Sequence, residues 1–201
     1  GAGGAGVECL GVQAIVDQYT QTNYWGSNAF FGSSIQGINR DAVAAWNANI
    51  LANSGVARVI DSNLLEQAFN QIHIDSGYQP DMIIGHHSVV RALLDSVAAD
   101  RRYVSPGKAP TFDAGHSGLS FNGVQIEADR LAPFNSLLVF RKEALKKFTL
   151  KPAGFADDDG NVLRRVSDLD RWEFWISTYF NLGCNGNMKS LLMIRDIQTD
   201  F

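Results

Sequence analysis

The stretch from Tyr78 to Pro106, YQPDMIIGHHSVVRALLDSVAADRRYVSP, decides the fold class. A turn around Pro80 leads into the short apolar run Met82–Gly85, which predicts a buried strand. Ser88 then predicts the cap of a helix that extends to about Asp100, because apolar residues recur at helical spacing behind it. A strand followed at once by an amphipathic helix indicates a protein that mixes α and β structure.

Three more helices are predicted upstream of this stretch. The clearest begins after Asp61 or Ser62 and ends at Gly77, with apolar residues three and four positions apart. Residues 7–21 are moderately amphipathic, and the alanine-rich residues 39–53 end at a Ser-Gly pair as a short helix would. In the alanine-rich segment three apolar residues would share one face: Val43, Trp46 and Ile50.

Downstream of residue 118 the pattern changes to strands. Asn122-Gly123 is the strongest short signal for a tight turn, and it lies between Leu119–Phe121 and Val124–Ile126. Leu137–Phe140 and Leu191–Ile194 are apolar runs typical of buried strands. Helices and antiparallel hairpins in separate stretches predict the class α+β.

A second hairpin is predicted over residues 155–180, with its turn at Asp157–Gly160. Strand alternation would place Trp172 on one face and Trp175 on the other. An aromatic residue on each face implies that both faces are covered, so a neighbouring subunit or an amino-terminal arm is expected to cover one of them. In an isolated chain one tryptophan should therefore be unusually exposed.

Composition excludes several classes of protein. The chain has 201 residues, 45% of them hydrophobic, which excludes general disorder. The formal net charge of -4 excludes a global electrostatic footprint for nucleic acid, so any such contact must be local. Cys9 and Cys184 match no metal or redox spacing, and free thiols are expected. No apolar run approaches the roughly 20 residues that span a bilayer, so no membrane partner is expected.

The candidate chemical groups do not converge in the sequence. His86 and His87 are adjacent, so in an extended segment they would point to opposite faces, and His73 and His116 are isolated. A zinc site needs three or four converging ligands. Ser117 lies in a degenerate G-x-S-x-G pattern in a loop, without the strand that a nucleophile elbow requires before it. The sequence therefore predicts no catalytic residue, no metal and no cofactor.

Two charged runs are also candidate binding sites. Asp157–Gly160 begins like a calcium loop, but Val162 and Asp168 stand where that loop needs glycine and glutamate. The sequence therefore favours a hairpin tip over a calcium site here. A basic cluster follows the strand at 137–140, and it could contact phosphate or an acidic neighbour, although a solvated face is favoured. Its members are Arg141, Lys142, Lys146, Lys147 and Lys151.

The order of elements resembles the carboxy-terminal half of tailed-bacteriophage major capsid proteins, whose Hong Kong phage-type fold is shared with encapsulins. The resemblance is carried by the opening stretch, by GLSFNGVQIEAD (118–129), by LAPFNSLLVFRKEALKKF (131–148) and by DDDGNVLRRVSDLDRWEFWISTYFNLGCNGNMKSLLMIRDI (157–197). It implies a structural subunit of an icosahedral phage or prophage head that encloses double-stranded DNA. It also implies a location in the virion, after synthesis in the bacterial cytoplasm.

The resemblance divides the chain into two lobes. Residues 1–54, with a spine helix near 7–25, and the hairpin at 146–184 would form the peripheral lobe. Residues 55–145 would form the axial lobe, a central sheet flanked by helices, and residues 185–201 would add its final strand. A long loop at 101–118 would point to the centre of a pentamer or hexamer, where four of its residues would contact neighbouring subunits: Arg101, Arg102, Tyr103 and Lys108.

The implied partners are other copies of the chain, then scaffold, portal or decoration proteins, and DNA only by non-specific contact. The family's amino-terminal arm and extended loop are not found, so the chain is expected to be processed or a fragment that folds without closing a shell. Two alternatives stay open. One is an encapsulin-like nanocompartment shell; the other is a small hydrolase or metal enzyme using His86, His87, His116 or Ser117.

Overall fold

The computed structural model describes residues 11–16, 34–40, 42–98, 119–157, 160–166 and 170–199. Its helices are α1 (Val12–Val16), α2 (Ser62–Ser76) and α3 (His87–Ala98), with short 3-10 turns at Ala44–Trp46, Lys142–Ala144 and Met188–Ser190. Its strands are β1 (Ser34–Ile35), β2 (Ile38–Asn39), β3 (Asn49–Leu51), β4 (Met82–Gly85), β5 (Ser120–Phe121), β6 (Val124–Ala128), β7 (Leu137–Phe140), β8 (Leu145–Phe155), β9 (Arg164–Arg165), β10 (Trp172–Glu173), β11 (Ile176–Cys184) and β12 (Leu191–Ile194).

A six-stranded mixed sheet forms the body of the molecule, in the order β3-β12-β7-β4-β6-β5. β7 is antiparallel to both of its neighbours, β12 and β4, whereas β3 is parallel to β12 and β6 is parallel to β4. The predicted strands at 82–85, 137–140 and 191–194 are confirmed and lie side by side at its centre. The class α+β is likewise confirmed.

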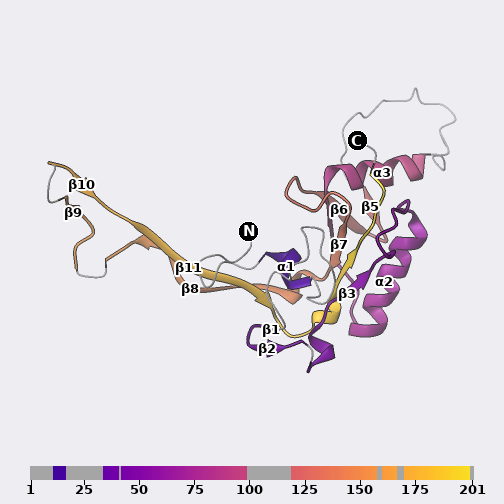
Figure 1. Cartoon of the computed structure of the whole chain (residues 1–201), viewed down its shortest axis with the longest axis horizontal. Helices are drawn as coiled ribbons and strands as arrows, with labels where there is room; N and C mark the ends of the chain where they lie inside the picture. Colours follow the sequence, from indigo (N-terminus) through magenta and orange to yellow (C-terminus); the bar gives the residue numbers. More distant parts are fainter. Residues whose placement is uncertain are drawn as a thin grey trace.

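Both faces of the sheet are buried. α2 and α3 cover one face, where they pack on Leu137, Val139 and Leu192. The alternate residues Leu138 and Met193 face the opposite side, against α1 and the start of the long hairpin. Figure 1 shows α2 and α3 on one side of the sheet and α1 on the other. Burial on both faces explains why the central strands read as continuous apolar runs.

α2 has the bounds that its sequence predicts. The Asp61 side chain accepts a hydrogen bond of 2.8 Å from the Leu64 N–H, and Gly77 ends the helix in the left-handed region at φ 75°. The hairpin turn at Asn122-Gly123 is also confirmed, with φ values of 48° and 81°. These signals depend on contacts and backbone conformations within a few residues, so they can be read from the local sequence.

α3 begins one residue before the position predicted for its cap. The imidazole Nδ1 of His86 lies 3.2 Å from the Ser88 N–H, and the His86 carbonyl accepts from Val89 and Val90. His86 therefore caps the helix, and Ser88, the predicted cap, lies inside it. The Ser88 hydroxyl instead lies 3.1 Å from the Phe134 carbonyl, which ties the helix to the segment before β7.

The predicted helix at 39–53 is wrong. The segment holds β2, the turn at Ala44–Trp46 and β3, so Val43, Trp46 and Ile50 share no helical face. β3 adds a parallel edge strand to β12. Because pairing with an existing sheet satisfies backbone groups that a short alanine-rich helix leaves open, the tertiary partner overrides local propensity.

The second hairpin is real, but it extends beyond residues 155–180, the range that its residue pattern predicts, and it turns elsewhere. β8 pairs antiparallel with β11 from Leu145↔Cys184 to Phe155↔Ile176, and β9 pairs with β10 further out. The chain therefore reverses between Arg165 and Trp172, and not at Asp157–Gly160. Figure 1 shows this hairpin leaving the body as a long projection. The turn predicted at Asp157–Gly160 is therefore not the tip of the hairpin.

Two other predictions fall largely outside the described residues. Of the helix predicted at 7–21, the structure describes Val12–Val16 as helical. The loop at 101–118 lies outside the described residues, with Arg101, Arg102, Tyr103 and Lys108 in it. Among the described residues no helix is long and apolar enough to cross a membrane.

Candidate assembly arm

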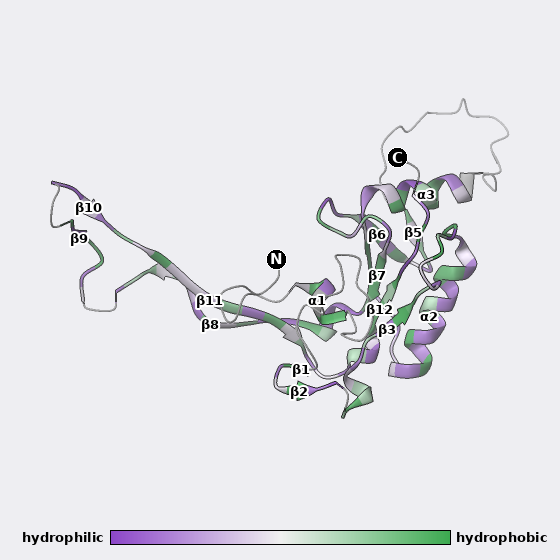
Figure 2. Ribbon diagram, in the orientation of Figure 1, coloured by the Kyte–Doolittle hydropathy of each residue, from purple (hydrophilic) through white to green (hydrophobic). Residues whose placement is uncertain are grey.

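The projecting hairpin, residues 145–184, is the candidate functional surface and is called the arm below. Beyond its root, most of its large apolar side chains that the structure describes are exposed, and Leu150 reaches 90% exposure. Figure 2 shows hydrophobic residues interleaved with hydrophilic ones along it. The exposed large apolar residues of the arm are Phe148, Leu150, Phe155, Val162, Leu163, Trp172, Phe174, Trp175, Ile176, Tyr179 and Phe180.

So many exposed large apolar side chains on one element are unusual for the surface of a folded protein. An isolated two-stranded hairpin is at best marginally stable in water, and large contiguous apolar patches mark sites that bind another molecule. The only aromatic contact between the described rings of the outer arm is Phe155 against Phe174, with centroids 5.5 Å apart. A single chain therefore leaves most of this apolar surface without cover.

The arm is irregular midway along its length. The register between β8 and β11 shifts twice, between Ser177 and Tyr179 and again between Tyr179 and Phe180. Pro152 lies in β8 close to these shifts and has no N–H to donate. Bulges of this kind add twist to a strand and change the direction of the side chains that follow.

The root of the arm is fixed firmly to the body. The Asn185 N–H donates to the Ala144 carbonyl at 2.8 Å, which closes the base of the hairpin. The Cys184 N–H donates to Oε1 of Gln36 at 3.1 Å, from the tight turn between β1 and β2. Cys184 also belongs to the apolar cluster on the α1 face of the sheet. The arm therefore projects from a rigid base.

Gly183 allows this close approach. A Cβ at Gly183 would lie 2.5 Å from Nε2 of Gln36 and 3.0 Å from a ring carbon of Phe148. Contacts that short force neighbours to move, so glycine lets the β1–β2 turn lie directly against the arm. Gly154, further out, has only the Pro152 carbonyl at 4.0 Å.

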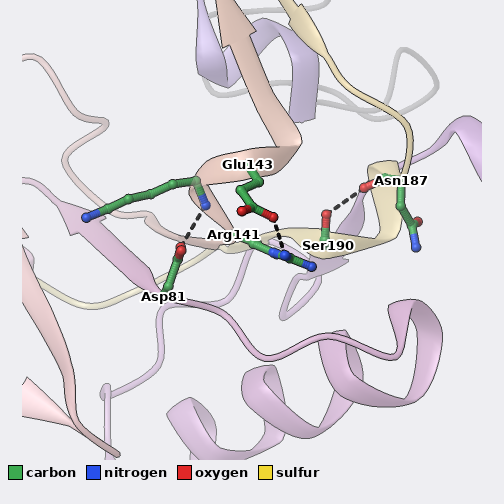
Figure 3. Close-up of polar contacts among 6 residues, drawn as sticks. Asp81, Arg141, Glu143, Asn187 and Ser190 are labelled. Atoms are coloured by element: carbon green, nitrogen blue, oxygen red, sulfur yellow. Dashed lines mark hydrogen bonds and ion pairs between the residues drawn. The ribbon is translucent and has the colours of Figure 1, made fainter.

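A polar cluster braces the segment that enters the arm. The Arg141 guanidinium lies 4.1 Å from the centre of the Tyr78 ring and forms an ion pair with Glu143. The Asp81 carboxylate accepts from the Lys142 N–H at 2.7 Å. Figure 3 shows the contact of Arg141 with Glu143 and the contact of Asp81 with the backbone, beside Asn187 and Ser190. The cluster links the loops before β4 and β12 to the start of β8.

An open polar groove of about 470 Å³ lies over this cluster, between the end of α2 and the turn before β12. Asn187 and Ser190 line it, yet both are engaged: the Asn187 side chain accepts from the Lys189 N–H, and the Ser190 hydroxyl donates to the Asn187 carbonyl at 2.6 Å. Arg141 is already paired. These side chains therefore stabilise the loops around the groove, and the charged pair Arg141 and Glu143 is already satisfied.

Trp172 and Trp175 lie on the outer arm and are 64% and 50% exposed. Both rings are exposed where one was expected to be, and their burial between subunits stays a prediction. The strand faces expected for residues 172–177 are not formed as predicted, because β10 ends at Glu173 and β11 begins at Ile176.

The groups considered for chemistry do not form a site in the described part of the chain. His86 is buried against the Phe134 ring, with centroids 4.4 Å apart, whereas His87 is exposed. No group of three or more His, Cys, Asp or Glu residues that could hold a metal is present among the described residues. His116 and Ser117 lie outside those residues.

Cys184 is buried and free at the root of the arm. Burial raises the pKa of its thiol from 9.0 to about 11, because the apolar surroundings disfavour the thiolate. A neutral buried thiol behaves as a small apolar side chain. Cys184 is therefore part of the packing that holds the arm.

Together, a mixed sheet covered on both faces and a long hairpin that continues from its central strands β7 and β12 define the Hong Kong phage-type capsid fold. Two solved structures share it. A chain of the cyanophage A-1(L) capsid asymmetric unit matches with a TM-score of 0.64 and 15% identity, over 92% of this chain and 65% of that chain. A chain of the holo-SrpI encapsulin complex from Synechococcus elongatus PCC 7942 matches with a TM-score of 0.53 and 12% identity, over 76% of this chain and 55% of that chain.

The likeness is one of fold, since both identities are low. The chain spans about two thirds of the length of the capsid chain and about half of the encapsulin chain. No protein-family model and no curated protein matches the sequence. The resemblance read from the sequence is confirmed at the level of the fold, and both shell-forming classes named by it are found among the structural matches.

Sequence reasoning missed the root of the arm. Gln36 and Gly183 are far apart in the sequence, and no motif connects them. The run Gln36-Gly37, with φ values of 53° and 77°, is the one local signal that could have indicated the β1–β2 turn. The residue pattern alone places the hairpin at 155–180, whereas the resemblance places it at 146–184, and β8 and β11 extend from Leu145 to Cys184.

Proposed function

We propose that the protein is a structural subunit that self-assembles into capsomers of an icosahedral phage or prophage head enclosing double-stranded DNA. The observation that carries this proposal is the arm: a projection fixed firmly at its root, with apolar side chains that its own chain leaves exposed. The fold shared with a phage capsid chain supports the same function. The function requires binding and no catalytic step.

The physical argument is that assembly removes the arm's apolar surface from water. Burial contributes about 25 cal/mol per Å² of apolar surface, and large aromatic residues are enriched in the centres of interfaces. Trp172, Trp175 and Phe174 provide such residues on the outer arm. The two open edges of the β8–β11 ribbon also carry backbone groups that another chain can pair with.

We also propose which parts of the chain form each lobe and which residues contact neighbouring subunits. Residues 55–145 with 185–201 form the axial lobe, and residues 1–54 with the hairpin at 146–184 form the peripheral lobe. Arg101, Arg102, Tyr103 and Lys108 contact neighbours at the centre of pentamers and hexamers. Scaffold, portal or decoration proteins bind the assembled shell, and packaged DNA is contacted only non-specifically. The site of synthesis is the bacterial cytoplasm, and the site of action is the virion.

An encapsulin-like nanocompartment is the second candidate, and the structural match to an encapsulin chain favours it. The two functions share the fold and the self-association and differ in what the shell encloses. Nuclease-protected DNA in purified particles supports the phage head. Enclosed protein without DNA supports the nanocompartment.

The test is assembly of the complete gene product, produced in bacteria and observed by electron microscopy and sedimentation velocity. We expect closed particles from the unaltered protein. Replacing Trp172 and Trp175 by Ser should leave capsomers or monomers, because the interface loses its largest apolar side chains. Ile74 is the matched control: it is 78% exposed on α2, away from the arm, so Ile74→Ser should assemble normally.

Two results would contradict the proposal. The first is a monomer at every concentration for the unaltered complete product. The second is normal particles from the double tryptophan variant, which would show that the outer arm is not an interface.

A further inference from the structure

The two edges of the arm differ near its root. In an antiparallel ribbon the backbone N–H and C=O groups of successive residues point alternately toward the partner strand and away from it. The bond from the Asn185 N–H to the Ala144 carbonyl makes this pair an inward one, and the register continues without a shift as far as Thr149↔Phe180. The backbone groups of Lys147 and Thr149 therefore point away from β11.

The β11 edge is capped near the root. Its outward N–H groups there belong to Cys184 and Leu182, which alternate with the inward residues. The Cys184 N–H donates to Oε1 of Gln36 at 3.1 Å, and the Leu182 N–H donates to Oδ1 of Asn181 at 2.9 Å. Side chains of the same protein therefore occupy the donors that another strand would need.

The β8 edge has no such cap at Lys147 and Thr149 among the described residues, and both residues are exposed. β8 pairs only with β11 in a two-stranded sheet, which Figure 1 shows as a ribbon that leaves the body. Nearer the body, the outward N–H of Leu145 is bonded to the Lys142 carbonyl. An uncapped edge of this kind can pair with another strand.

We propose that β8 pairs with β8 of a second copy of this chain about a two-fold axis centred on Phe148. The inference rests on the proposed function and identifies one contact between subunits. The two ribbons form a continuous antiparallel sheet in the order β11-β8-β8-β11. In this register Lys147 lies opposite Thr149 of the second copy, and each symmetric pair exchanges both of its backbone hydrogen bonds.

Two other axes near the same residues are less favourable. An axis at Lys147 places this lysine opposite its own copy, and like charges directly opposite each other destabilise a sheet. An axis at Thr149 pairs Lys147 with Lys151, whose carbonyl accepts a hydrogen bond of 3.3 Å from the Thr178 hydroxyl of β11. An axis at Phe148 pairs the two open residues with each other and avoids both problems.

The same register brings exposed apolar side chains together on one face of the sheet. Phe148 and Leu150 are 45% and 90% exposed, and they share a face because they are two residues apart. The axis places Phe148 beside Phe148 of the second copy, in a non-hydrogen-bonded pair, where side chains lie closest. Leu150 falls diagonal to that ring and opposite Lys146, whose methylene chain can cover it. Pairing therefore removes these apolar side chains from water.

Cysteine cross-linking in the complete gene product tests the register. In a non-hydrogen-bonded pair the two Cα atoms lie about 4.5 Å apart, and a disulfide spans Cα distances of about 4.4–6.8 Å. Phe148→Cys should therefore give a disulfide-linked dimer when assembled protein is mildly oxidised. Leu150→Cys should not link to itself, because its two copies would lie more than about 13 Å apart along the ribbon.

A mixture of two variants makes the test specific to the register. Proteins with Lys146→Cys and with Leu150→Cys should link to each other, because these positions lie opposite each other about the axis. Lys146→Cys alone should not link to itself. Mass spectrometry of the linked peptides separates these disulfides from any that involve Cys9 or Cys184, and the unaltered protein is the control for those native thiols.

A second test removes one backbone donor. Thr149→Pro lacks the N–H that faces the second copy, whereas Thr149→Ala loses only the side chain. The proline variant should self-associate about tenfold more weakly than the alanine variant in sedimentation velocity, because each two-fold contact loses one hydrogen bond from each copy. The Thr149 N–H points away from β11, so the arm itself should stay paired, which hydrogen exchange of β11 checks.

The outcomes separate this inference from the proposed function. Assembled particles in which Phe148→Cys forms no disulfide, or in which Leu150→Cys links to itself, overturn the inference and leave the shell function standing. Equal association of the proline and alanine variants, with β11 equally protected in both, also overturns it. Absence of assembly by the unaltered protein overturns both.

Discussion

Gly85 is the last residue of the central strand β4 and lies just before α3. A Cβ at this position would lie 2.5 Å from Cδ1 of Leu137 and 3.7 Å from two side-chain carbons of Val89. The sequence predicted a strand ending here but gave no reason for the glycine. Only the paired strand and the helix that follows show that β7 and α3 come too close for a side chain.

Replacing Gly85 by Ala should therefore destabilise the body. The added methyl group forces Leu137 out of its position in a fully buried cluster, and overpacking of this kind costs about 1–3 kcal/mol. Urea denaturation measures the change in the free energy of unfolding. Gly154→Ala on the arm is the control, since a Cβ there meets only ordinary contacts. Equal stability of the Gly85→Ala protein would mean that β7 shifts freely, against the packing described.

Ionisation of the Cys184 thiol should lower the stability of the folded chain at alkaline pH. Burial raises the pKa of its thiol to about 11 in the folded chain, from 9.0. Between these values the unfolded chain loses the proton first, so the folded state is progressively destabilised as pH rises above about 9. The loss from this group is at most about 3 kcal/mol when the pH passes 11.

The check is to measure urea denaturation from pH 7 to pH 11 for the unaltered protein and for Cys184→Ala. Lysine and tyrosine titration affects both proteins, so the difference between the two curves isolates the thiol. The unaltered protein should lose more stability above pH 9 than the variant does. Parallel curves would show that Cys184 ionises as freely in the folded state as in the unfolded one.

Among the elements, α2 and the β5–β6 hairpin could be predicted from the sequence because their signals are local. Asp61 and Gly77 cap the helix, and Asn122-Gly123 makes the turn, each through backbone groups within a few residues. β3 could not be predicted, because its stability comes from pairing with β12 far along the chain. The arm shows both cases: its apolar residues predict strands, but the register shifts at Ser177–Phe180 and the position of its tip have no local sequence signal.

The arm should be the least protected element of the unassembled chain. Its two strands pair only with each other, and its side chains are largely exposed, so local opening needs little free energy. Hydrogen exchange should therefore be much faster in β8 and β11 than in β7 and β12. In assembled particles exchange in the arm should slow markedly. Slow exchange of the arm in the free chain would indicate that the ribbon is stable without a partner.

At the scale of the whole molecule, the body and the arm meet at a narrow junction. The body has a sheet with both faces covered, and its two apolar clusters draw their residues almost entirely from outside the arm. The exceptions are Cys184 and the partly buried Leu145 and Leu182 at the root. Folding and association are therefore properties of different parts of the chain, and they can be separated by removing the outer arm.

This separation can be tested in a shortened protein that lacks residues 148–181 and joins Lys147 to Leu182 through an Asn-Gly turn. These two residues are paired in the β8–β11 register, so a two-residue turn can connect them without moving the root. Leu145, Leu182 and Cys184 keep their contacts with the body, and the Asn185 N–H still reaches the Ala144 carbonyl. The shortened protein should unfold cooperatively, with a free energy of unfolding within about 1 kcal/mol of the unaltered chain, because the deleted side chains are mostly exposed. It should remain monomeric in sedimentation velocity, since the apolar surface that brings copies together is gone. A shortened protein that fails to fold would show that the arm supports the body, and one that still forms closed particles would place the essential contacts elsewhere in the chain.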